Sequence, residues 1–213
     1  MLRLIRAGID INPHYRKITP MVADELARWG DWKDAAWIWD SVLTSRPYVV
    51  AILSNVARAY TSMGETSKAM EYLARAKKIQ PRAPAVRSLE VILLARSGQP
   101  DQALKQAREA IADNVIDYDL ANAAFSLAWR AGDFAFAAKA MHLRMEGWPF
   151  SRADGYVQLG DLYAKGVKDP EQALAAYKQA LALTPEQGRG NLLRHLPPEY
   201  LPKLGFANGA PAP

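Results

Sequence analysis

The sequence predicts an all-α protein made of stacked antiparallel helix pairs. Three residue types that recur with one period of 34 residues support this prediction. The glycines of the period are Gly30, Gly64, Gly98, Gly132 and Gly166, the alanines are Ala35, Ala69, Ala103 and Ala137, and the prolines are Pro13, Pro47 and Pro81. Self-similarity at a fixed period of this length is the signature of a repeat architecture.

Each repeat unit has the pattern of a helical hairpin, as the unit around Gly64 illustrates. Apolar residues recur at helical spacing on both sides of this glycine, which predicts one amphipathic helix before it and another after it. They are Leu53, Val56, Ala57 and Tyr60 before the glycine, and Ala69, Leu73 and Ala76 after it. Glycine suits the end of the first helix, and Pro81 stops the second because proline cannot continue a helix.

Applied to every unit, the pattern predicts an almost wholly helical chain. The expected helices span residues 1–11, 16–29, 32–45, 50–63, 66–79, 84–97, 100–113, 118–131, 134–147, 153–165 and 170–183. We expect the two helices of a hairpin to meet at the recurring alanines, because a small side chain lets their backbones approach closely.

The unit that ends at Pro185 resembles the tetratricopeptide repeat (TPR), whose signature places small and aromatic residues in a fixed order. The matching residues are Tyr156, Leu159, Gly160, Tyr163, Ala173, Tyr177, Ala180 and Pro185. Two units depart from the signature, with Val115 in place of a closing proline and Ala124-Phe125 in place of a small-residue pair. The resemblance implies a right-handed superhelical solenoid with five TPR-like repeats over residues 16–185.

The two ends of the chain differ from a complete repeat. Residues 1–15, which include Pro13, have the pattern of a second helix without its first. This segment is either an N-terminal cap or the opening of a piece of a longer protein, and both alternatives stay open. After Pro185 we expect a C-terminal capping helix over residues 186–196. A flexible tail rich in Pro, Gly and Ala follows over residues 197–213, with too little apolar content to order itself.

Composition and motifs exclude several chemistries. Cysteine is absent, which excludes disulfides and thiol nucleophiles, and the histidines His14, His142 and His195 have no partner at metal-ligand spacing. No nucleotide-binding, zinc-protease or serine-hydrolase motif occurs. Asp117 and Asp119 precede a predicted helix, so we interpret them as residues that stabilise its N-terminus. We therefore expect no enzyme activity, no cofactor and no metal.

Charge and hydropathy narrow the classes of partner. The formal net charge of +5 is too small to indicate nucleic-acid binding. The longest apolar stretches fall far short of the roughly 20 residues that span a bilayer. We expect neither a nucleic-acid partner nor membrane insertion by this chain itself.

TPR solenoids line a concave groove with the solvent-facing residues of their first helices, and the resemblance implies that a protein or peptide partner binds there. The positions carried over are Asp24, Arg28, Asn55, Arg58, Ser62, Ser88, Arg96, Asn122, Ser126, Trp129 and Arg130. Asparagine can pair with a ligand backbone, and arginine can clamp carboxylates or phosphates. Asn55 and Arg58, in the middle of a helix, are the favoured anchors. The arginines just before a turn glycine also suit the C-terminal end of a helix.

Four of the six tryptophans lie between residues 29 and 39. Trp32 and Trp39 occupy positions where the repeat places aromatic core residues, so we expect them to be buried. Trp29 and Trp37 lie off these positions. If exposed, they offer an alternative partner-binding patch or a platform for a sugar.

A second resemblance covers the segment from Ile11 to Lys17 and on through Ala23 to Trp32. It resembles the soluble C-terminal region of bacterial O-antigen ligase or polymerase-type membrane glycosyltransferases, which include protein O-oligosaccharyltransferases. It implies a periplasmic, non-catalytic region that positions an acceptor or partner and is attached to an upstream membrane portion. The leading hypothesis is a non-catalytic TPR scaffold, which as a complete chain is expected in the cytoplasm.

Overall fold

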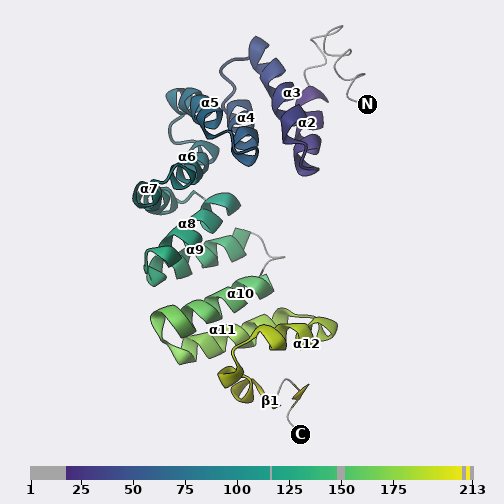
Figure 1. Cartoon of the computed structure of the whole chain (residues 1–213), viewed down its shortest axis with the longest axis vertical. Helices are drawn as coiled ribbons and strands as arrows, with labels where there is room; N and C mark the ends of the chain where they lie inside the picture. Colours follow the sequence, from purple (N-terminus) through teal and green to yellow (C-terminus); the bar gives the residue numbers. More distant parts are fainter. Residues whose placement is uncertain (1–17, 116, 148–151, 208–209, 212–213) are drawn as a thin grey trace. The chain divides into compact units, whose positions relative to one another are not determined.

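The computed structural model describes residues 18–115, 117–147, 152–207 and 210–211 (Figure 1). The chain forms two compact units, unit 1 over residues 1–115 and unit 2 over residues 116–213. The helix expected over residues 1–11 lies outside the described residues, and so does the half-repeat expected over residues 1–15.

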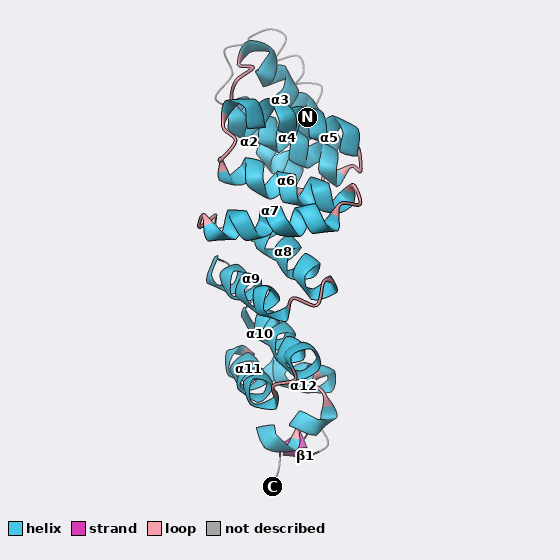
Figure 2. Cartoon of the chain, turned by 90° about the vertical axis from the view of Figure 1, so that its left-hand side faces the viewer, coloured by secondary structure: helices cyan, strands magenta, loops and turns pink. Residues whose placement is uncertain are grey.

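Helices make up nearly all of the described chain (Figure 2). The helices of unit 1 are α2 (Ile18–Arg28), α3 (Trp32–Ser45), α4 (Val50–Ser62), α5 (Thr66–Ile79), α6 (Pro84–Arg96) and α7 (Pro100–Ala112). Those of unit 2 are α8 (Tyr118–Arg130), α9 (Phe134–Gly147), α10 (Arg152–Asp161), the π-helical turn η2 (Leu162–Val167), α11 (Pro170–Leu183) and α12 (Glu186–His195). Two 3-10 turns, η3 (Pro198–Tyr200) and η4 (Pro202–Leu204), and a short antiparallel pair of strands, β1 (Phe206–Ala207) and β2 (Ala210–Pro211), follow α12.

Consecutive helices pack as pairs within each unit. The pairs are α2 with α3, α4 with α5, and α6 with α7 in unit 1, and α8 with α9, and α10 with α11 in unit 2. Successive pairs also stack on one another: α3 contacts α4, α5 contacts α6, and α9 contacts α10. The predicted all-α, TPR-like solenoid of helix pairs is therefore confirmed.

The turn glycines at positions 30, 64, 98 and 132 all have left-handed backbone, with φ between +73° and +83°. Only glycine adopts this region without a steric cost from Cβ. At Gly64, the N–H of Glu65 donates to the carbonyl of Tyr60 at 2.9 Å, which closes the end of α4. The recurring glycine thus reverses the chain after each of these first helices.

Gly166 keeps the sequence period but plays a different structural part. It lies in η2 without a positive φ, and Lys168 carries the left-handed conformation instead, with φ 60°. A Cβ on Gly166 would lie 2.6 Å from Cδ1 of Phe134, so this glycine permits a close approach of η2 to the start of α9. The longer turn between α10 and α11 explains the difference, because the reversal comes two residues later.

The recurring alanines lie at the helix contacts that the sequence predicts. Ala35, Ala69, Ala103 and Ala137 are all fully buried. A methyl group is the largest side chain that such close packing admits without displacing a helix.

Polar residues form the end of α7 and the start of α8. After α7, which has Val115 in place of a closing proline, Asn114 adopts φ 59° and its N–H donates to the carbonyl of Ile111 at 3.1 Å. At the start of α8, the carboxylate of Asp117 accepts the N–H of Leu120 at 2.9 Å. This bond confirms the capping interpretation of Asp117.

The C-terminal segment differs from the flexible tail expected from residue 197. Tyr200 is only 6% exposed, and its ring packs edge-on against Tyr177 of α11 with the ring centroids 5.0 Å apart. Leu193, Leu196 and Tyr200 join one buried cluster with Leu181. A terminal repeat has no following repeat to cover its apolar face, and α12 with η3 supplies that cover here.

We predict that Ala69→Leu destabilises the protein by ~1–3 kcal/mol, because the added atoms overpack the contact between α4 and α5. Ala74→Leu, at an exposed position of the same helix, is the control and is expected to change stability little. Urea unfolding followed by circular dichroism measures both. Equal midpoints for the two variants would contradict the helix register described above.

A pair of glycine substitutions in unit 2 separates turn glycines from helical ones. Gly132→Ala forces a Cβ into left-handed backbone, at φ +73°, and is expected to cost roughly 1–2 kcal/mol. Gly190→Ala, inside α12 with no neighbouring atom in the way, is expected to stabilise the protein by about 0.5–1 kcal/mol. Shifts of the same sign in thermal unfolding would show that the turn geometry is misassigned.

Tyr200→Ala is expected to destabilise unit 2 by about 3 kcal/mol, since it removes a buried aromatic ring from the surface of α11. The matched control is Glu199→Ala, at the neighbouring exposed position. Hydrogen exchange of the α11 amides reports the effect directly. Unchanged protection in Tyr200→Ala would mean that the segment after α12 contributes no cover.

Candidate functional site

A cavity of 310 Å³ lies between α8 and α10 of unit 2, and we call it the α8–α10 pocket. Its lining residues are Phe125, Ser126, Trp129, Arg130, Gln158 and Asp161. Both helices are first helices of their hairpins. Three of the residues that the sequence predicts for the groove, Ser126, Trp129 and Arg130, therefore meet around one cavity.

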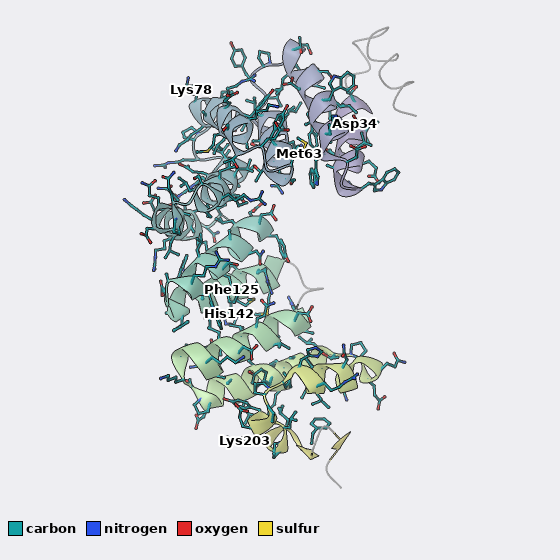
Figure 3. The ribbon with its side chains drawn as sticks, in the orientation of Figure 1. Asp34, Met63, Lys78, Phe125, His142 and Lys203 are labelled. Atoms are coloured by element: carbon teal, nitrogen blue, oxygen red, sulfur yellow. The ribbon has the colours of Figure 1, made fainter. Side chains whose placement is uncertain are left out.

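Aromatic rings form the apolar wall of the pocket. The rings of Phe125 and Trp129 lie one helical turn apart on α8, with centroids separated by 5.8 Å. Trp129 also makes an edge-on contact with Phe134 of α9, with the ring centroids 6.0 Å apart. Figure 3 labels Phe125 among the side chains of α8. Since Phe134 is itself held against Gly166, the wall is braced by packing and offers its surface in a defined position.

The polar side of the pocket carries one anion and one cation. The Asp161 carboxylate accepts the hydroxyl of Tyr177 at 2.8 Å and lies 3.4 Å from Nζ of Lys165. Burial, together with this hydrogen bond, raises the pKa of Tyr177, which therefore stays a protonated donor to Asp161. Arg130 makes no ion pair with any residue that the structure describes. The charge of Asp161 is thus already compensated locally, and that of Arg130 is available to a ligand.

A buried arginine lies behind this surface. Arg144 of α9 is only 6% exposed. Its Nη1 donates to Oδ1 of Asn122 on α8 at 3.3 Å, and its Nη2 donates to Oε1 of Gln158 on α10 at 3.1 Å. Its Nε has no hydrogen-bond partner in the described part of the chain. One guanidinium therefore links the two first helices through their amide side chains.

In unit 1 the predicted groove residues are spread over α2, α4 and α6. The amide of Asn55 donates to Oδ1 of Asp24 at 3.5 Å, which joins α4 to α2. Arg58 is half-buried and already engaged with a neighbour, whereas Ser62 is exposed at the end of α4. Asp24 and Asn55 thus share a polar contact, and none of the described pockets is lined by these residues or by Arg58.

Ser88 is a correction to the predicted groove. It is fully buried within α6, so it offers no surface to a partner. Its position in the repeat corresponds to Ser54 in α4, which is also buried, and to Asn122 in α8, which is exposed. A small serine packs inside the helix stack, whereas the longer asparagine reaches its surface.

The burial predicted for Trp39 is confirmed, and that predicted for Trp32 is confirmed only in part. Trp39 is 3% exposed and Trp32 packs partly buried against the core of unit 1. Trp29 and Trp37 are exposed to 74% and 38%.

Within the ranges that the structure describes, no three His, Asp or Glu side chains come together as a metal site. None of the described helices is long and apolar enough to cross a membrane.

Comparison with known protein families identifies repeats of a known type in this chain. The family model described as tetratricopeptide repeat matches residues 50–82, which hold α4 and α5, and residues 153–187, which hold α10 and α11. Two helix pairs of this chain are therefore tetratricopeptide repeats. Both matched segments are helix pairs with the turn and contact geometry given above.

Several solved structures share the fold of this chain. A crystal structure of the MamA protein has a TM-score of 0.58 and 19% identity, and the match covers 87% of this chain and 98% of that one. PilW, a widely conserved type IV pilus biogenesis factor, has a TM-score of 0.64 and 18% identity, with coverage of 92% and 89%. A thermophilic TPR protein of Thermus thermophilus has a TM-score of 0.61 and 18% identity, with coverage of 80% and 92%. At these identities the likeness concerns the fold alone.

No curated protein matches the chain. The resemblance to O-antigen ligases and polymerases therefore stays a prediction from one stretch of sequence.

The TPR repeat lets equivalent arginines be compared. Arg28, Arg96 and Arg130 all precede a turn glycine at the same repeat position. Arg28 pairs with Glu25 of its own helix at 2.9 Å, and Arg96 donates to the carbonyl of Thr61 at the end of α4. Arg96 thus stabilises a helix C-terminus, although it is the end of the preceding first helix rather than its own. Arg130 alone of these three lines a cavity among the described pockets.

Sequence reasoning missed Arg144, Gln158 and Asp161, although two of them carried a signal. The TPR signature places alanine where Arg144 stands, as at Ala76 and Ala110, both fully buried. Asp161 is equivalent to Ser126, a predicted groove residue of the preceding repeat. The two are 35 residues apart instead of 34, so a search at a strict period of 34 does not find Asp161. Gln158 carried no comparable signal.

Proposed function

We propose that this protein is a non-catalytic TPR scaffold that binds an extended peptide segment of a protein partner at the α8–α10 pocket. One observation carries the proposal. Predicted groove residues from α8 converge with Gln158 and Asp161 of α10 around one cavity.

The composition of the pocket suits a peptide. Two aromatic rings offer apolar area at little entropic cost, and polar groups around them provide hydrogen bonds that fix register. Such an aromatic centre with a polar rim is where interfaces concentrate their binding energy. A cavity of 310 Å³ accommodates a side chain rather than a large cofactor.

Unit 1 offers a second polar surface. Asp24, Asn55 and Arg58 place an acid, an amide and a cation on neighbouring first helices. We assign it a supporting role, since Asn55 already donates to Asp24 and Arg58 already has a partner.

The test begins with a displayed library of random peptides selected on the full chain. Trp129→Ala removes the aromatic wall, so the enriched peptides are expected to bind this variant about tenfold or more weakly, as measured by fluorescence anisotropy. Trp29→Ala, at the most exposed tryptophan of unit 1, is the matched control and should leave affinity unchanged.

The opposite pattern of affinities would refute the proposal. If Trp29→Ala abolishes binding while Trp129→Ala does not, the partner surface is the exposed tryptophan patch. If no enriched peptide depends on Trp129, the α8–α10 pocket is not a peptide site.

A further inference from the structure

The burial of Arg144 needs an explanation beyond packing. Its guanidinium is removed from water, yet no carboxylate in the described part of the chain pairs with it. Burying a cation without a counter-charge costs free energy, and alanine fills the same position in neighbouring repeats. Two amide oxygens are all that it binds among the described residues.

Those two hydrogen bonds determine how the amides of Asn122 and Gln158 are oriented. Arginine has only donors, so the amide atom facing it must be the oxygen in both cases. The NH₂ group of each amide then points away from Arg144. An unassisted surface amide could rotate to present either group. At Gln158, which lines the pocket, the donor group is thus the part of the amide that remains available to a ligand.

Gln158 also stands at a junction between two cavities. It lines the α8–α10 pocket and a second cavity of 530 Å³, between α10 and α12, whose lining includes Val157, Asn191 and His195. Asn122 is exposed on α8, one turn before Ser126. The two cavities share Gln158, so a ligand that occupies both would be an extended chain rather than a compact molecule.

The charged residues of the pocket indicate which side chains an extended peptide ligand would carry. Arg130 lines the pocket without an ion pair in the described residues, whereas Asp161 is already bonded to Tyr177 and lies near Lys165. An acidic side chain complements the unpaired cation, and the Phe125–Trp129 wall takes an apolar neighbour.

We infer that Arg144 is a positioning residue, which holds the Asn122 and Gln158 amides so that their N–H groups receive the carbonyls of an extended peptide carrying an apolar residue beside an acidic one. This inference rests on the proposed function, since it specifies the ligand of the same pocket. Arg144 itself acts only through the two amides.

Substitutions at Gln158 test whether its amide donates hydrogen bonds to the peptide or only accepts one from Arg144. Gln158→Glu keeps an acceptor for Arg144 and adds a counter-charge, so the melting temperature is expected to stay equal or rise. It removes both N–H donors, so the affinity for the selected peptides is expected to fall about tenfold. Gln179→Glu, at an exposed position of α11, controls for added negative charge and should bind as wild type.

Gln158→Met removes the donors without adding charge. It is expected to lose affinity to a similar extent, but with a lower melting temperature, because Arg144 then lacks one of its acceptors. Arg144→Met frees both amides to rotate and should weaken peptide binding although it touches no ligand. Arg130→Gln should weaken only peptides that contain Asp or Glu.

The outcomes are distinct for the two proposals. Peptides that depend on Trp129 but bind Gln158→Glu as tightly as wild type would overturn this inference and leave the proposed function standing. Selected peptides without enrichment of Asp or Glu would overturn the acidic component. Absence of any Trp129-dependent peptide would overturn both proposals.

Discussion

Close approach of two helix backbones at an alanine is the contact on which this structure depends. Ala69 lies fully buried where α4 meets α5, and equivalent alanines hold the other pairs. A short hairpin turn can join helices only if their axes are near one another, which is why a left-handed glycine and a buried alanine recur together. A helix pair alone leaves an apolar stripe uncovered, and stacking of the next pair covers it.

The need to cover an apolar stripe also applies after the last described helix pair. After α11 the described chain has no further hairpin, and the apolar face of α11 would meet water. The helix α12 and the turn containing Tyr200 cover it instead, and the ring of Tyr200 lies against Tyr177. The Tyr177 hydroxyl in turn holds Asp161 at the rim of the α8–α10 pocket. The segment that composition alone predicts to be flexible thus supports, through one aromatic contact, a residue of the candidate site.

Exceptions to the repeat mark the candidate site. Where alanine would give the usual close contact, Arg144 brings a buried cation, and the amides of α8 and α10 are organised around it. Where the signature has a small residue in the first helix, Phe125 supplies one wall of the pocket. The regular positions hold the solenoid together, and a substitution at one of them can create binding chemistry without losing the fold.

Most helix bounds in the described residues, four of the five periodic turn glycines and the buried alanines were predictable from the sequence, because each follows from local spacing that repeats along the chain. The candidate site was only half predictable. The period placed Ser126, Trp129 and Arg130 on one face of α8, but it could not show that Gln158 and Asp161 of α10 would close a cavity with them. Nor could it distinguish Arg96, bound to a carbonyl of α4, from Arg130 at the pocket, since both have the same place in the repeat. The period shows which residues occupy equivalent positions in successive repeats. The contact partner of a side chain depends instead on which atoms the packed helices bring near it.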